Sequence, residues 1–115
     1  MGKQIPVQDP RAISQATFAN ELQASASGCT VYGVSGFNSK VNSQYIQIHD
    51  VSATPIDTSV PKYNIKVPAD SNFSVDFGLV GMPFKNGVYL CNSSTPQTKT
   101  IGLVDCQFFM LQTLP

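Results

Sequence analysis

The chain contains little charge and no tryptophan, and these absences exclude several classes of protein. Only 12% of its 115 residues are charged, against about 25% in a typical globular domain. Seven basic and seven acidic residues cancel, and the lysines are scattered along the chain. Nucleic-acid binding requires a basic stripe that neutralises phosphates, and membrane-surface binding requires a basic amphipathic helix. Neither pattern is present, so we expect no nucleic-acid partner and no membrane partner.

Long apolar runs are absent as well. The longest apolar stretches cover a few residues, whereas a membrane-spanning helix needs about 20. The first residues, Met1 to Pro6, lack the apolar segment of a secretory signal, which predicts synthesis in a cytoplasm. The length of the chain is that of one domain.

Metal, redox and catalytic motifs are missing too. Cys29, Cys91 and Cys106 lie far apart and form no C-x-x-C pair, so we expect buried free thiols rather than a zinc or redox site. His49 is the only histidine, and its neighbour Asp50 would point to the opposite face of a strand, so the two cannot form a dyad directly. The aspartates are too dispersed for a calcium loop, and no glycine-rich phosphate loop occurs. We therefore predict no catalytic residue, no metal, no cofactor and no enzymatic activity. A small hydrolase or redox enzyme built on these cysteines or on His49 is the disfavoured alternative.

The sequence does contain short segments in which apolar and polar residues alternate, as in Tyr63 to Val67 and Phe73 to Phe77. Successive strand residues point to opposite faces, so each segment would have one buried and one wet face. Gly33 and Gly36 lie inside the first such segment, where glycine marks a bulge or a close backbone approach. The expected strands cover about residues 29–37, 44–51, 62–67, 72–77, 87–92, 98–102 (weakly) and 104–112. Their near-regular spacing predicts an all-β fold, with a single antiparallel β-sandwich or jelly-roll-like domain over residues 29–115.

Residues 1–28 differ from the rest in composition. They contain two early prolines and then a stretch rich in Ala, Ser and Gln, with spacing that supports at most a weak, short helix. Such a segment cannot fold alone, so we expect an extended N-terminal arm that orders against a neighbouring subunit, a flexible leader being the alternative. The large apolar side chains that this arm would bury are Ile5, Val7, Ile13, Phe18 and Leu22.

The last expected strand is apolar on both faces. If Cys106, Phe108 and Met110 face the core, Phe109 and Leu111 must face the other way. A strand that is apolar on both sides is normally covered on both sides. We therefore expect Phe109 and Leu111 to lie at a contact with another subunit, and the chain to form a homo-oligomer.

Four tyrosines offer a different interpretation, because aromatic faces can stack on sugars. Carbohydrate sites favour tryptophan, which this chain lacks, so positions at the rim of the core or at subunit contacts are the simpler expectation. The tyrosines are Tyr32, Tyr45, Tyr63 and Tyr89.

Several stretches of the chain, taken together, are similar to a known family. They are Tyr32 to Ser39, Gln44 to Asp50, Val60-Pro61, Ser71 to Gly78, Phe84 to Thr95 and Asp105 to Leu111. Over about residues 29–112 this pattern resembles small virion proteins of tailed bacteriophages, while residues 1–28 lie outside the match.

The resemblance implies a β-sandwich on the capsid surface of a phage particle, made in the host cytoplasm and acting as a head decoration (cement) protein. Its partner would be the major capsid protein. Decoration proteins commonly occupy symmetry positions, so the resemblance also implies a homo-oligomer, a trimer being preferred over a dimer. The alternative function is a virion-surface or tail-associated module that recognises host glycans.

Overall fold

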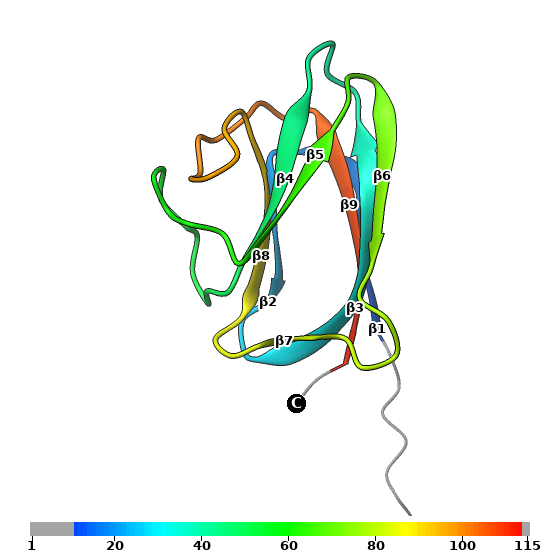
Figure 1. The fold of residues 1–115 in the computed structure, drawn as a ribbon, viewed down its shortest axis with the longest axis vertical. Coiled ribbons are helices and arrows are strands. Elements are labelled where there is room, and N and C mark those ends of the chain that lie inside the picture. The colour runs from blue at the N-terminus through cyan, green and yellow to red at the C-terminus, as the bar shows by residue number, and fades with distance from the viewer. Residues whose placement is uncertain (1–10, 114–115) are drawn as a thin grey trace, which may run out of the picture.

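The structure, a computed structural model, describes residues 11–113. These residues form nine β-strands and no helix (Figure 1). The strands are β1 (Arg11–Ala19), β2 (Glu21–Ser25), β3 (Cys29–Asn38), β4 (Gln44–His49), β5 (Tyr63–Val67), β6 (Ser71–Asp76), β7 (Met82–Phe84), β8 (Val88–Ser93) and β9 (Cys106–Thr113). Within the described residues, no helix has the length and apolarity that are needed to span a lipid bilayer.

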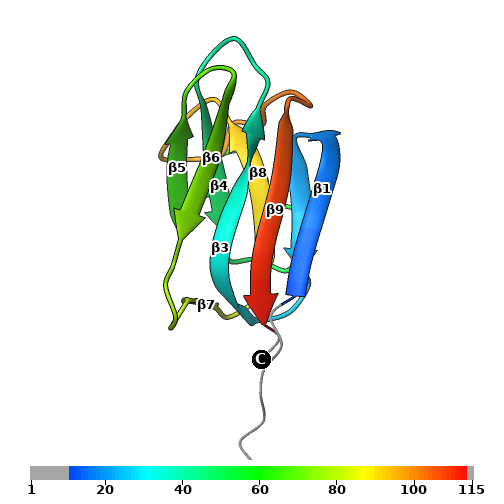
Figure 2. The same cartoon turned by 90° about the vertical axis from the view of Figure 1, so that its right-hand side faces the viewer.

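The strands form two antiparallel sheets that pack face to face (Figure 2). Sheet A has the order β1-β9-β3-β6, with β7 also pairing with β3, and sheet B has the order β2-β8-β4-β5. The predicted all-β antiparallel sandwich is therefore confirmed. Each paired strand contributes alternate side chains to the space between the sheets.

The hydrophobic core lies between the sheets. Large apolar side chains that face the core recur at every second position along the central strands, as with Ile46 and Ile48 of β4, because the period of a strand is two. The largest apolar ones are Phe108 from β9, Ile46 and Ile48 from β4, Leu90 from β8, and Val31 and Val34 from β3. All three thiols are buried and unpaired, as predicted.

The N-terminal region departs from the predicted boundary at residue 28. Residues 11–25 contain no helix and form β1 and β2, which extend the two sheets. β1 pairs with β9, with Ile13 opposite Met110, and β2 pairs with β8, with Leu22 opposite Leu90. Ladder hydrogen bonds to β9 and β8 hold these strands, so they need few large apolar residues of their own. The expected arm residues Ile5 and Val7 lie outside the described residues.

Two glycines in β3 have the roles that were predicted for them. The register with β9 shifts between Val31 and Gly33, which is a bulge. At Gly36 a Cβ atom would lie 2.0 Å from the Gln107 carbonyl oxygen and 2.5 Å from the Phe73 ring. The backbone of β9 and the ring of Phe73 can approach this closely only because no side chain is present.

The remaining strand predictions differ in detail. The weak strand expected over 98–102 is only an isolated bridge between Ser93 and Ile101. The short strand β7 lies between the expected strands 72–77 and 87–92, where no strand was predicted. It has three residues and includes Pro83, so it carries little strand signal.

Candidate interaction surface

The last strand presents apolar residues on both faces, as predicted. Cys106, Phe108 and Met110 point into the core and are buried. Phe109 is half-buried on the opposite face, and Leu111 beside it is 42% exposed. This opposite face is the outer face of sheet A, the side that points away from sheet B. The apolar outer face of β9 is therefore not covered within the described chain.

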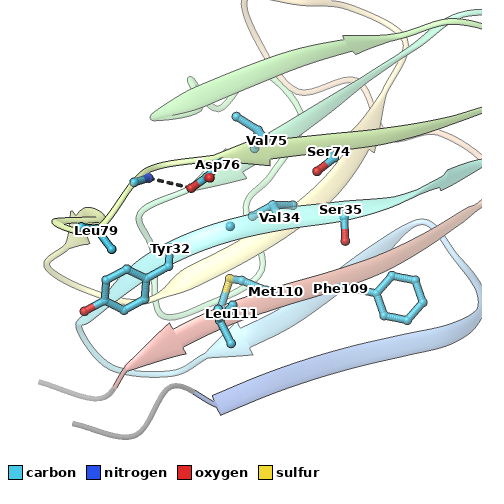
Figure 3. A pocket seen from close by; sticks show the side chains of 12 residues that line it. Tyr32, Val34, Ser35, Ser74, Val75, Asp76, Leu79, Phe109, Met110 and Leu111 are labelled. Atoms are coloured by element: carbon cyan, nitrogen blue, oxygen red, sulfur yellow. Dashed lines mark hydrogen bonds between the residues drawn. The ribbon is translucent and has the colours of Figure 1, made fainter. Parts of the chain in front are cut away.

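A shallow groove of about 690 Å³ runs over this outer face (Figure 3). Its walls come from β3, β6 and β9 and from the turn after β6, and its apolar lining includes Tyr32, Leu79, Phe109 and Leu111. Asp76 is the one charged residue of the lining. The groove suits a partner that offers apolar and hydrogen-bonding groups rather than charge.

The turn after β6 holds an apolar side chain out at one end of the groove. Asp76 Oδ1 accepts a hydrogen bond of 2.7 Å from the backbone N–H of Gly78, which has a φ of 77°. Glycine adopts this left-handed conformation without strain. The turn leaves Leu79 99% exposed and the next residue, Val80, exposed as well. A pair of large apolar residues in open solvent is unusual in a turn and typical of a contact surface.

Leu79 and Val80 were not among the interface residues predicted from the sequence. Their signal was present, because they form an apolar pair between Gly78 and Gly81, where turn residues are otherwise polar. Phe109 and Leu111 were selected, and the structure places both beside the groove.

The arm residues that were predicted to form an interface have different surroundings. Ile13 and Leu22 are partly buried and pack against the core of their own chain. Phe18, near the end of β1, is 47% exposed. Phe18 is thus the described arm residue whose side chain remains available to a partner.

The outer face of sheet B, in contrast, is covered by two loops, residues 50–62 and 94–105. The loops are joined to each other, because Thr58 N–H donates to Lys99 O (2.8 Å) and Lys99 N–H donates to Ser59 O (2.7 Å). The second loop is also joined to β4, where Gln47 Nε2 donates to Thr95 O (2.8 Å) and to Thr98 O. Figure 1 shows both loops on the same side of the sandwich.

Beneath these loops lies a buried polar cluster around Lys99. The Lys99 side chain is 4% exposed, and its Nζ lies 3.2 Å from Glu21 Oε2 and also donates to Pro55 O. His49 is 1% exposed, and its Nε2 lies 3.1 Å from Gln47 Oε1. This arrangement fixes the loops over the sheet through paired polar groups.

Two buried titratable side chains near Lys99, those of His49 and Cys91, are held in their neutral forms. Burial, with a smaller contribution from the Lys99 charge, lowers the pKa of His49 from 6.5 to about 4. Burial raises the pKa of Cys91 to about 12, so its thiol stays protonated. A protonated, enclosed thiol and an enclosed neutral imidazole are poor candidates for nucleophile and base. Within residues 11–113, no three His, Cys, Asp or Glu side chains gather as a metal site.

The four tyrosines do not form one sugar-stacking platform. Tyr32 lies on the outer face of sheet A, whereas Tyr45 and Tyr89 alternate with core residues of sheet B and face the other side of the molecule. Tyr63 packs edge-on against Phe77, with ring centroids 5.2 Å apart. The tyrosines therefore occupy three separate surroundings.

Comparisons with known proteins give a limited result. No protein-family model and no curated protein matches the chain. Among solved structures, the chain is similar to the coat protein of Tobacco streak virus in a C2 crystal form, with 11% identity and a TM-score of 0.46 over 99% of this chain and 92% of that one. The Tobacco streak virus coat protein dimer gives 11% identity and a TM-score of 0.44, over 98% and 90% of the two chains. At these values no conclusion about function or assembly follows from the likeness.

Proposed function

We propose that this chain is a virion structural protein, and specifically a capsid decoration protein that binds the major capsid protein through the outer face of sheet A. The observation that carries the proposal is the uncovered apolar groove between Leu79 and Phe109. The resemblance of residues 29–112 to small phage virion proteins supports the same role.

The energetics of the groove favour attachment through several copies at once. Burying an exposed leucine stabilises a complex by about 1.5–3 kcal/mol, and the groove offers Leu79 and part of Leu111. A single small site of this kind binds weakly. On a capsid lattice, however, an oligomer engages several sites at once, and multivalency converts weak contacts into firm retention.

The uneven treatment of the two outer faces supports the direction of docking. Sheet B is already covered by the 50–62 and 94–105 loops, whose backbones are hydrogen-bonded to each other. Sheet A has no such cover among the described residues. The protein would therefore place sheet A against the shell and the loops toward solvent.

A glycan-binding module on the virion surface or tail is less well supported. That alternative depended on aromatic side chains gathered on one face, and the tyrosines lie on different faces. A glycan array probed with the assembled protein tests it directly, and specific binding would favour it.

The proposal is tested by mixing purified protein with phage heads that lack it and measuring the fraction that co-sediments. Replacing Leu79 with Ala should weaken binding about tenfold or more, because most of the leucine side chain would lose its contact. The matched control is Ile56→Ala, which removes a comparably exposed apolar side chain from the loop over sheet B.

Equal binding by Leu79→Ala and the wild type would contradict docking through sheet A. A cryo-EM map of the particle without density for this chain would contradict the decoration role altogether.

A further inference from the structure

Each sheet ends in edge strands, whose outer backbone N–H and C=O groups can pair with another chain. Most of these edges are protected. At one side of the sandwich, β5 is flanked by Lys62 and carries Lys66, and charged residues discourage edge pairing. On the same side, sheet A ends at β6, which lies between Asp70 and its last residue Asp76, and at β7, whose Pro83 has no N–H to offer. The rings of Tyr63 and Phe77 also meet on this side.

The edge strand β2 of sheet B is protected in a different way. Gln23 Nε2 donates a hydrogen bond of 2.8 Å to Ser52 O in the 50–62 loop. Glu21, at the start of the strand, pairs with the buried Lys99. The strand is also short, with five residues. A second chain would have to displace these contacts to reach β2.

The edge strand β1 has none of these protective features. β1 has nine residues and pairs with β9 on one side. Among the described residues, no strand pairs with its other side. From Ala12 to Ala19 the sequence contains no charged residue, proline or glycine. A long, uncharged edge of this kind is a template for pairing with another chain.

The first half of β1 is the part best suited to such pairing. Its register with β9 is regular from Arg11 to Gln15 and shifts only between Gln15 and Ala19. The outward side chains in the regular part, Ala12 and Ser14, are small and exposed. A second strand that pairs with Ala12 to Ser14 would meet no bulky or charged side chain on the outer face of β1.

We propose that β1 of one copy pairs antiparallel with β1 of a second copy, so that sheet A continues across a two-fold axis. A second copy suits this edge because an isologous contact uses the same surface, the edge of β1, on both subunits. A ring of three would need a second, complementary surface on each subunit. The inference favours a dimer over the trimer expected from the resemblance. It does not depend on capsid binding.

The pairing has a geometric consequence that can be tested. An axis passing near Ile13, the centre of the regular stretch, places Ala12 of one copy opposite Ser14 of its partner on the outer face. Cross-strand neighbours interact strongly through their side chains, so like charges there repel and opposite charges attract. It also places the two apolar grooves on the same side of one continuous sheet.

The experiment uses the full chain and sedimentation velocity at low salt over a range of concentrations. The wild type is expected to form a species of twice the monomer mass. One variant carries Ala12→Lys and Ser14→Lys, and the other carries Ala12→Glu and Ser14→Glu. Each variant alone should self-associate about tenfold less tightly or worse, and an equimolar mixture should recover a dimer.

The control variant carries the same two charges on β6, the opposite edge strand of sheet A, through Asn72→Lys and Ser74→Lys. This variant should remain dimeric. A wild-type chain that stays monomeric overturns the proposal, including the case in which residues 1–10 of the same chain occupy the edge. Charged β1 variants that are folded and as dimeric as the wild type also overturn it. Recovery of the dimer only in the mixture supports it, because opposite charges relieve the repulsion only where positions 12 and 14 of the two copies meet. A β6 variant that remains dimeric separates edge pairing from packing through the outer face of sheet A.

Discussion

His49 illustrates how the surroundings of one residue determine its chemistry. In the sequence it is a lone histidine on a predicted strand, beside an aspartate with which it cannot pair directly. The structure adds that the side chain lies under a loop, next to Gln47 and near the Lys99 charge. That information was not in the local pattern, because the 94–105 loop covers β4 only after the whole chain has folded.

The lowered pKa of His49 predicts a specific loss of stability in acid. The folded chain binds this proton only near pH 4, whereas the unfolded chain binds it near pH 6.5, so the unfolded state takes up more protons between these values. Stability should be complete above pH 6.5 and should fall by up to about 3 kcal/mol as the pH approaches 4. Urea unfolding at several pH values measures this decline.

The variant His49→Gln removes the titrating group and should flatten the decline, even if its stability at pH 7 is lower. Asp50 does not interfere in this window. Its burial would raise the carboxyl pKa, but backbone N–H groups of Asn86, Lys85 and Gly87 and the charge of Lys62 lower it overall. Its contribution is therefore lost only at more acidic pH. Equal slopes for the two proteins would contradict the assignment to His49.

At the scale of elements, the sequence was sufficient wherever a strand had its own apolar alternation. The strands from β3 to β6, together with β8 and β9, were predicted to within about two residues of their observed bounds. β1 and β2 were missed because small and polar side chains dominate them, and their stability depends on neighbours far along the chain. The special roles of Gly33 and Gly36, by contrast, were predicted from the residue type alone, since glycine inside a strand marks a bulge or a close backbone approach.

The integration of β1 into sheet A predicts the result of truncation. Removing residues 1–20 deletes β1, exposes the edge of β9 and uncovers core contacts of Ile13 and Ala19. The truncated chain should melt at a clearly lower temperature than the full chain, because lost apolar burial and lost ladder hydrogen bonds both destabilise the fold. Thermal unfolding followed by circular dichroism measures the change.

A second truncation that removes only residues 1–10 serves as the control, because it leaves the described strands intact. If both truncated chains melt at the temperature of the full chain, β1 contributes nothing to the fold and its pairing with β9 is wrong.

At the scale of the whole molecule, the sandwich has one covered face and one bare face. The sequence predicted a bare apolar face from Phe109 and Leu111, but it could not predict the cover over sheet B. That cover depends on the 50–62 and 94–105 loops meeting through backbone hydrogen bonds, which have no side-chain signature.

This asymmetry predicts which amides are protected when the protein docks on a phage head. Hydrogen exchange should slow in the turn that carries Leu79 and Val80, because docking would bury it. Exchange in the 50–62 loop should not change, since that loop would still face solvent. Mass spectrometry of peptides from free and head-bound protein measures both, and protection confined to the 50–62 loop would reverse the proposed orientation.

The position of β9 has a consequence for how the protein is made. β9 is the last described strand to be synthesised, yet it lies between β1 and β3 within sheet A. Until β9 has been synthesised, β1 has no partner in its sheet and β3 has one side open. Closure of so many non-local pairings is intrinsically slow, and in sheet A it must wait until β9 has been synthesised. During this interval the exposed strands are open to aggregation, so a slow or stalled ribosome would endanger the yield of this protein.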